Sequence, residues 1–188
     1  MKPWLVVEDE EDIRNIVKVM FTAWGHTSID FRDGNQTYAW LDKVEAGAYQ
    51  GELPELALLD IKMPGPRGNE IARRMRAFEQ FKTIPIILMT AFTLEDQERQ
   101  SMVREDGVDY IINKPLPDFF ELKKQLEEIF EKKKARVTTV QTKAASGDVT
   151  KAAGTSANQT KVANGEVAQA ATSDSERNAD ASGKSAND

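Results

Sequence analysis

The stretch Leu56-Ala57-Leu58-Leu59-Asp60-Ile61-Lys62-Met63-Pro64-Gly65 decides the fold of this chain. Its four leading apolar residues are typical of a strand buried on both faces, as strands of a parallel sheet are. The Met63-Pro64-Gly65 turn follows that strand. Asp60 is therefore predicted to be an exposed carboxylate at the carboxyl end of a buried strand, which is where open α/β sheets bind ligands.

Three further apolar runs also stop at polar residues. They are Trp4–Val7 before Glu8 and Asp9, Ile84–Met89 before Thr90, and Tyr110–Asn113 before Lys114. The carboxyl ends of parallel strands meet at one edge of a sheet, so an acid pair, an Asp, a Thr and a Lys are expected to form one site.

Helical spacing of apolar residues separates these strands. The first helix is expected to bury Ile13, Ile16, Val17, Met20, Phe21 and Trp24. A short second strand is expected over Thr27–Phe31, and further helices after Asp33-Gly34 and over Asn69–Phe81, Leu94–Asp106 and Asp118–Lys134. Five strands that alternate with five helices predict an α/β fold with right-handed crossovers and a parallel sheet.

Composition separates a folded part from a tail. From Val137 to Asp188 the chain has no Leu, Ile, Phe, Trp, Tyr or Met, so this segment has almost no apolar surface to bury. We therefore expect one domain over residues 1–135 and a disordered, low-complexity tail over residues 136–188.

The same composition disfavours several kinds of function. The 25 basic and 31 acidic residues give a net charge of -6, which argues against direct binding to nucleic acid. Without cysteine the chain has no disulfide, thiolate metal site or thiol nucleophile, and its one histidine, His26, has no second histidine to share a metal. No apolar run is long enough to span a membrane and no secretory signal is present, so a cytoplasmic location is expected.

The carboxylate cluster predicts phosphoryl chemistry. Glu8, Asp9 and Asp60 at one sheet edge resist ionising together, and a hard divalent cation such as Mg²⁺ relieves that conflict. Asp60 can then act as a nucleophile toward a phosphoryl group, while Thr90 supplies a hydroxyl and Lys114 a positive charge. Each residue alone is more often structural, as a turn former or a partner of the helix dipole. Their joint occurrence on separate strand ends favours a site.

With these residues in place, the chain from about residue 3 to residue 134 resembles the receiver domain of bacterial two-component response regulators. The matching motifs are Glu8-Asp9, Asp60 with Met63-Pro64 and Gly68, Thr90-Ala91, and Lys114-Pro115. The resemblance implies a flavodoxin-like, doubly wound five-stranded sheet of order 2-1-3-4-5. It also implies that Asp9, Asp60 and the backbone carbonyl of Lys62 hold Mg²⁺ with Glu8 beside them, and that the Lys114-Pro115 bond is cis.

The function implied is that of a stand-alone phospho-acceptor in a phosphorelay rather than of an enzyme. Asp60 would take phosphate from a histidine kinase or phosphotransfer protein and alter the face formed by the fourth helix, fifth strand and fifth helix. Two alternatives stay open: an aspartyl-nucleophile phosphatase or phosphotransferase, and a binding module independent of phosphorylation. The first is disfavoured because Lys62 stands where such enzymes commonly place a second Asp.

One position departs from the family pattern. Ile111 stands where receivers commonly carry the aromatic residue that couples to the Thr, and the neighbouring Tyr110 should face the opposite side of the sheet. We therefore expect the sparsely apolar fourth helix to move without an aromatic rotation. Lys62 and Phe92 are expected to overhang the site and limit the access of water.

Overall fold

The structure is a computed structural model that describes residues 2–146 of the chain. Its strands are β1 (Trp4–Val7), β2 (Ser28–Phe31), β3 (Leu56–Asp60), β4 (Ile86–Thr90) and β5 (Tyr110–Asn113). Its helices are α1 (Glu11–Ala23), α2 (Gly34–Glu45), α3 (Gly68–Ala77), the short 3-10 helix η1 (Glu79–Phe81), α4 (Asp96–Arg104) and α5 (Phe119–Ser146). The disorder expected of the tail concerns mainly residues 147–188, which lie outside the described part.

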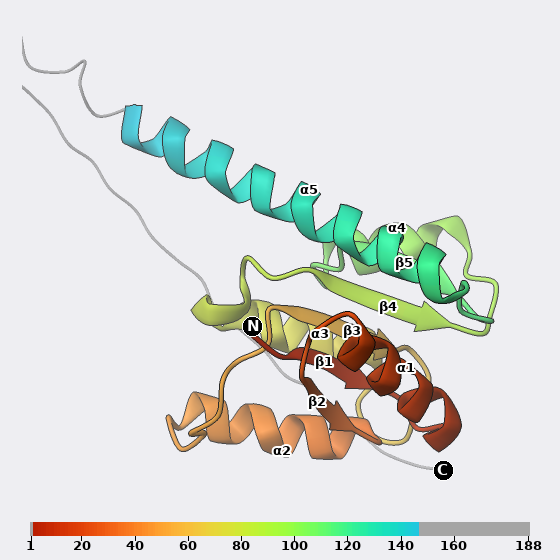
Figure 1. Cartoon of the computed structure of the whole chain (residues 1–188). Coiled ribbons are helices and arrows are strands. Elements are labelled where there is room, and N and C mark those ends of the chain that lie inside the picture. Colours follow the sequence, from red (N-terminus) through yellow and green to blue (C-terminus); the bar gives the residue numbers. More distant parts are fainter. Residues whose placement is uncertain (1, 147–188) are drawn as a thin grey trace, which may run out of the picture. The chain divides into compact units, whose positions relative to one another are not determined.

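The five strands form one parallel sheet in the order β2-β1-β3-β4-β5, which confirms the predicted fold class (Figure 1). The register places Val7 beside Leu59, Asp60 beside Met89, and Thr90 beside Asn113. The strands that carry the predicted polar residues therefore end at the same level of the sheet.

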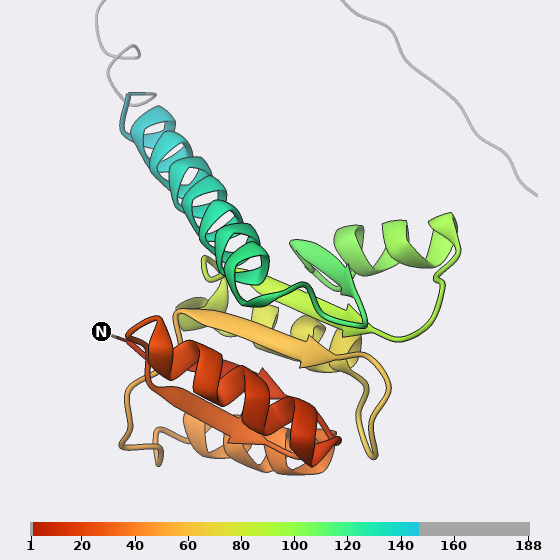
Figure 2. The same ribbon diagram turned by 45° about the vertical axis from the view of Figure 1, so that its right-hand side comes forward.

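Helices cover both faces of the sheet, with α1 and α5 on one face and α2, α3 and α4 on the other (Figures 1 and 2). Each face of the sheet has its own hydrophobic core, and successive strand residues point to opposite cores. Leu5 and Val7 pack on the side of α2 and α3, whereas Trp4 and Val6 pack on the side of α1 and α5. Burial on both faces explains why β3 is apolar without alternation.

Several expected boundaries were wrong. Phe78 has extended backbone, so α3 ends at Ala77 and only η1 follows. Helix α4 is shorter than expected at both ends: Glu95 forms a capping box that starts it at Asp96, and it ends at Arg104. Strand β4 begins at Ile86, two residues after the expected start at Ile84.

Two further corrections concern α1 and α5. Ile16 is 54% exposed because the buried stripe of α1 is narrower than its apolar pattern and centres on Val17 and Phe21. Helix α5 does not end at Lys134 but continues to Ser146, and its second half extends beyond the sheet in both views (Figures 1 and 2). No Gly or Pro interrupts that stretch before Gly147, so no helix-breaking residue ends α5 earlier.

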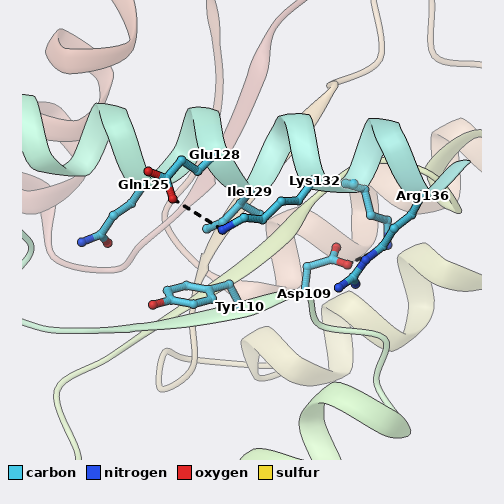
Figure 3. A pocket seen from close by; sticks show the side chains of 8 residues that line it. Asp109, Tyr110, Gln125, Glu128, Ile129, Lys132 and Arg136 are labelled. Atoms are coloured by element: carbon cyan, nitrogen blue, oxygen red, sulfur yellow. Dashed lines mark hydrogen bonds and ion pairs between the residues drawn. The ribbon is translucent and has the colours of Figure 1, made fainter. Parts of the chain in front are cut away.

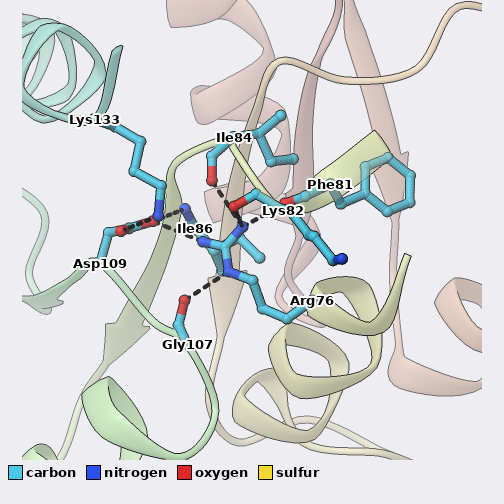
Figure 4. Close-up of polar contacts among 8 residues, drawn as sticks. All are labelled: Arg76, Phe81, Lys82, Ile84, Ile86, Gly107, Asp109 and Lys133. Carbon is cyan, nitrogen blue, oxygen red and sulfur yellow. Dashed lines mark hydrogen bonds and ion pairs between the residues drawn. The ribbon is translucent and has the colours of Figure 1, made fainter. Parts of the chain in front are cut away.

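A half-buried arginine, Arg76, contacts several elements at the edge of the sheet opposite the predicted site (Figure 4). Arg76 of α3 donates hydrogen bonds to the carbonyl oxygens of Ile84 and Gly107 and forms an ion pair with Asp109 at 2.7 Å. Asp109 also accepts from Lys133 of α5 at 2.7 Å. Burial lowers the pKa of Arg76, while Asp109 opposes that shift. This network fixes α3 and α5 against the starts of β4 and β5.

Candidate functional site

The predicted polar residues meet at the carboxyl edge of the sheet. They line a cavity of about 370 Å³ whose wall is formed by Asp9, Glu10, Asp60, Lys62, Thr90, Ala91, Phe92 and Lys114. Glu8 is completely buried beside it. One carboxylate oxygen from each of Glu8, Asp9 and Asp60 lies within 4.8 Å of the others. The structure therefore brings together the residues that the sequence placed on separate strand ends.

Lys114 joins the acidic residues across the sheet. Its Nζ lies 2.7 Å from Oε2 of Glu8 and 2.9 Å from Oδ1 of Asp60. The Asp60 side chain is only 5% exposed, so the expectation of an exposed carboxylate was wrong. The Lys114-Pro115 peptide bond is cis, as the resemblance implied.

The electrostatics of this cluster are unfavourable for three ionised acids. Burial raises the pKa of both Glu8 and Asp60, and the hydrogen bonds and charge of Lys114 offset that rise only in part. The charge of Asp60 raises the pKa of Glu8 further, and the charge of Asp9 does the same to Asp60. Burial lowers the pKa of Lys114, but its two acidic partners outweigh burial and raise it overall. The site therefore holds excess negative charge that one lysine does not balance.

Two glycines hold the loop that follows Asp60. A Cβ on Gly68 would lie 2.2 Å from the carbonyl oxygen of Asp60, so only glycine allows α3 to start this close to the end of β3. A Cβ on Gly34 would lie 2.0 Å from the carbonyl oxygen of Pro66, and the amide of Gly34 donates to Pro64 at 3.0 Å. The segment after Asp60 is thus packed against the first turn of α2.

Thr90 holds the opposite wall of the cavity. Its hydroxyl accepts from the amide of Phe92 at 3.0 Å and lies 3.2 Å from the carbonyl oxygen of Phe92. The Phe92 ring is 51% exposed, and Nζ of Lys62 lies 3.5 Å from its centroid. Lys62 and Phe92 were predicted to overhang the site, and both side chains line the cavity and contact each other.

Ile111 and Tyr110 face opposite sides of β5, as predicted. Ile111 is buried in the same cluster as Met102 of α4, whereas Tyr110 is 47% exposed and lies beside Ile129 below α5 (Figure 3). The side of β5 that faces α4 therefore has an aliphatic residue in place of an aromatic one.

Two neighbours of the cluster were missed by the sequence reasoning. Glu10 lies 3.9 Å from Nζ of Lys114, and Arg14 donates to the carbonyl oxygen of Glu8 at 2.7 Å. The run of five acids from Glu8 to Asp12 could have signalled the first contact. His26 lies outside the cavity and stacks on Trp4 with ring centroids 3.9 Å apart.

A doubly wound parallel sheet with this acidic cluster, threonine and lysine at its carboxyl edge defines a receiver-like α/β domain. The sequence profile of the response regulator receiver domain matches residues 4–127. The chain belongs to this family, whose members are signalling modules of two-component systems that histidine kinases phosphorylate.

The chain covers different shares of its curated relatives, less than half of one and most of another. The chain is 34% identical over 114 residues to the phosphate regulon transcriptional regulatory protein PhoB of Pseudomonas aeruginosa, a match that covers 61% of this chain but only 45% of PhoB. It is 30% identical over 122 residues to the polar-differentiation response regulator DivK of Brucella ovis, covering 64% of this chain and 91% of DivK.

Solved structures show the same fold. A CheY-like receiver domain protein from Methanospirillum hungatei has a TM-score of 0.59 at 22% identity, covering 72% of this chain and 98% of that one. The receiver domain of the sensor histidine kinase PA1611 from Pseudomonas aeruginosa has a TM-score of 0.55 at 25% identity, covering 69% and 98%. That structure has a magnesium ion coordinated in its active-site cleft. In the described residues of the present chain, no helix is long and apolar enough to cross a membrane.

Proposed function

We propose that this chain is a phospho-acceptor response regulator in which Asp60 receives a phosphoryl group from a histidine kinase or a histidine phosphotransfer protein. The observation that carries this proposal is the position of Lys114, whose Nζ bridges Glu8 and Asp60 within 2.9 Å. A lysine held there can pair with the oxygens of a phosphoryl group on Asp60 without leaving its place.

The donor set fits Mg²⁺. Three carboxylates gather oxygen atoms within 4.8 Å, and burial raises the pKa of two of them, as expected where a cation is needed to favour the charged forms. Hard oxygen ligands suit this ion. We assign the binding to Asp9, Asp60 and the backbone carbonyl of Lys62, with Glu8 completing the negative charge. Bound Mg²⁺ supplies the positive charge that the phosphoryl oxygens require.

The chain's own residues then perform the transfer. An Asp60 carboxylate oxygen attacks the phosphorus atom, an acyl phosphate forms, and the leaving group keeps the electron pair of the broken bond. Lys114 and the hydroxyl of Thr90 bind the phosphoryl oxygens. To do so, Thr90 gives up its contact with Phe92, which links the chemistry to the loop before α4.

We propose that the signal leaves the site as a pivoting of α4. The start of this helix has little to hold it, since Met102 is its one buried residue. Its far end is fixed: Asp106 accepts from Asn69 at 3.0 Å and from Arg73 at 2.6 Å, and Arg76 donates to Gly107 at 2.8 Å. A pull at Thr90 should therefore swing the first turns of α4 about this end.

The altered surface is the face formed by α4, β5 and α5. It includes a groove of about 240 Å³ between β5 and α5, lined by Asp109, Tyr110, Gln125, Glu128, Ile129, Lys132, Lys133 and Arg136 (Figure 3). With Ile111 in place of an aromatic residue, the α4 movement alone would carry the change to this face.

The two alternatives are weaker. A phosphatase or phosphotransferase of the aspartyl class needs a general acid close to the nucleophile, but Lys62 lies two residues beyond Asp60 and contacts Phe92. A binding module without phosphorylation would have no use for the Lys114 bridge. The expected domain boundary at residue 135 falls within α5, which continues to Ser146. We propose residues 1–146 as the signalling domain and residues 147–188 as a segment that it does not need.

The proposal is tested by incubating the chain with Mg²⁺ and acetyl phosphate and measuring its intact mass. The wild type should gain one phosphoryl group, and Asp60→Asn should gain none. An Asp96→Asn variant is a suitable control, because Asp96 is an exposed acid on α4. Phosphorylation of Asp60→Asn at the wild-type rate contradicts the proposal.

A further inference from the structure

We propose that the last part of α5, residues 132–146, binds the phosphate backbone of double-stranded DNA without reading its sequence. This binding does not depend on the chemistry of Asp60, because the end of α5 lies at the opposite edge of the sheet. The family profile matches residues 4–127, so the proposed binding segment lies beyond the part of the chain that the family shares.

The charge of α5 changes along its length. The stretch from residue 132 to residue 146 contains five basic residues and no acidic one, whereas the preceding turns contain both acids and bases. The basic residues are Lys132, Lys133, Lys134, Arg136 and Lys143. The net charge of -6, which argues against nucleic acid for the chain as a whole, therefore includes one basic helix end.

Two of these cations are available to an external anion. Lys132 and Lys133 have acidic partners at 3.5 Å and 2.7 Å, respectively. Lys134 and Arg136 are exposed, and neither forms an ion pair within residues 2–146. Their positive charges are not balanced by the folded chain.

A cavity beside this helix end offers a place for one phosphate group. It has a volume of about 280 Å³ and lies between α5 and the segment before β4. Lys2 and Lys134 line it together with the hydroxyl-bearing Thr83, and Glu55 is its one acidic residue. Glu55 also lies 3.7 Å from His26. Lysine and threonine side chains are common partners of backbone phosphates, so the lining suits this group.

The composition of the helix end favours DNA over a membrane or a protein surface. Val137 and Val140 are the only apolar residues larger than alanine in residues 132–146. Helices that bind membranes and hot spots of protein interfaces depend on larger apolar or aromatic side chains. Binding to the DNA backbone does not require them, because it is driven by the release of counterions from the phosphates.

The shape of α5 also suits a DNA duplex. The second half of the helix extends beyond the sheet in both views, so DNA can contact it while the acidic run Glu8–Asp12 stays at the other edge (Figures 1 and 2). An α-helix with its side chains is about 10–12 Å wide, and the major groove of B-DNA is about 12 Å wide. The helix end can therefore lie in this groove between the two rows of phosphates.

The inference is tested with the full chain and a fluorescent duplex of about 20 base pairs of mixed sequence, followed by anisotropy at several NaCl concentrations. The readout is the slope of the logarithm of the association constant against the logarithm of salt concentration, about -0.9 for each phosphate neutralised. With Lys2, Lys134, Arg136 and Lys143 as contacts, the wild type should give a slope of about -3 to -4. Asp60→Asn should give the same slope.

The double variant Lys134→Gln, Arg136→Gln should have a slope that is shallower by about 2. The matched control is Lys123→Gln, Lys124→Gln, which removes two positive charges from the first half of α5 and should keep the wild-type slope. Circular dichroism checks that both double variants are folded. Equal slopes in all three proteins, equal losses in the two double variants, or no binding at about 100 µM chain in low salt overturn the inference. Binding to phosphatidylserine vesicles but not to the duplex overturns it in favour of a membrane.

Discussion

Replacing Asp60 by Asn should stabilise the domain at neutral pH in the absence of Mg²⁺. The Asp60 side chain is 5% exposed, and its carboxylate lies among two other acids and one lysine. An amide of the same shape keeps the packing and removes the charge. Lys114 retains Glu8 as a partner at 2.7 Å, so no cation is left unpaired.

The size of the effect follows from the distances. Repulsion from Glu8 and Asp9, within 4.8 Å, costs about 3.5 kcal/mol per pair at an effective dielectric constant near 20. Attraction to Lys114 at 2.9 Å returns about 6 kcal/mol on the same scale. These contributions nearly cancel, which leaves the burial of the charge uncompensated. We expect a gain of about 1–3 kcal/mol in the free energy of unfolding, or several degrees in Tm.

The gain should depend on pH in a defined direction. Burial raises the pKa of Asp60 in the folded chain above its usual value of roughly 3.9. Below the usual value the residue is protonated in both the folded and the unfolded chain, so the charge costs nothing. As pH rises through the raised pKa, the folded wild type loses stability that the Asn variant does not lose. The difference between the two proteins should therefore widen from acid to neutral pH.

Urea unfolding of the wild type and Asp60→Asn, followed by circular dichroism in EDTA from about pH 4 to pH 7.5, measures this difference. Asp96→Asn provides a matched removal of an exposed charge on α4. Lower stability of Asp60→Asn at pH 7, or a difference that stays constant with pH, would refute the electrostatic reasoning.

Four further predictions follow from the same geometry. Mg²⁺ at ten times its dissociation constant should add about 1.4 kcal/mol to stability, and Asp9→Asn should lose most of that gain in a thermal melt. Phe92→Ala should shorten the lifetime of the phosphorylated form, because its ring covers the cavity; an unchanged rate of phosphate loss contradicts this. Arg73→Ala should increase amide exchange in residues 102–107, whereas Arg74→Ala, whose partners lie on α2, should not. Cutting the chain after Ser146 should leave Tm and phosphorylation nearly unchanged, and a fall of more than a few degrees contradicts the tail's dispensability.

Much of the fold was predictable because the spacing of apolar residues that is typical of a strand or a helix can be recognised in the local sequence. The run Leu56–Leu59 identified a strand buried on both faces, and the polar residues after each strand located the site. Element ends were less predictable, since they depend on single backbone conformations. Phe78 fits the apolar pattern of α3, yet its extended backbone ends that helix.

Contacts between residues that are distant in the sequence could not be predicted from it. Nothing in the local pattern around Arg76 shows that its partner is Asp109, or that Asp109 also binds Lys133. The residues of the site were predicted, but the burial of Asp60 was not, because burial depends on how segments that are distant in the sequence pack together. The exposure of Ile16 likewise depends on which stripe of α1 faces the sheet, and that stripe centres on Val17 and Phe21.

The most direct test of the central claim is the location of the phosphoryl group. The chain is incubated with Mg²⁺ and acetyl phosphate and then reduced with borohydride, which converts an aspartyl phosphate to homoserine. Peptide mass spectrometry then identifies the modified position. We predict homoserine at residue 60 alone; modification at Asp9 in its place, or no modification of any carboxylate, would contradict the account.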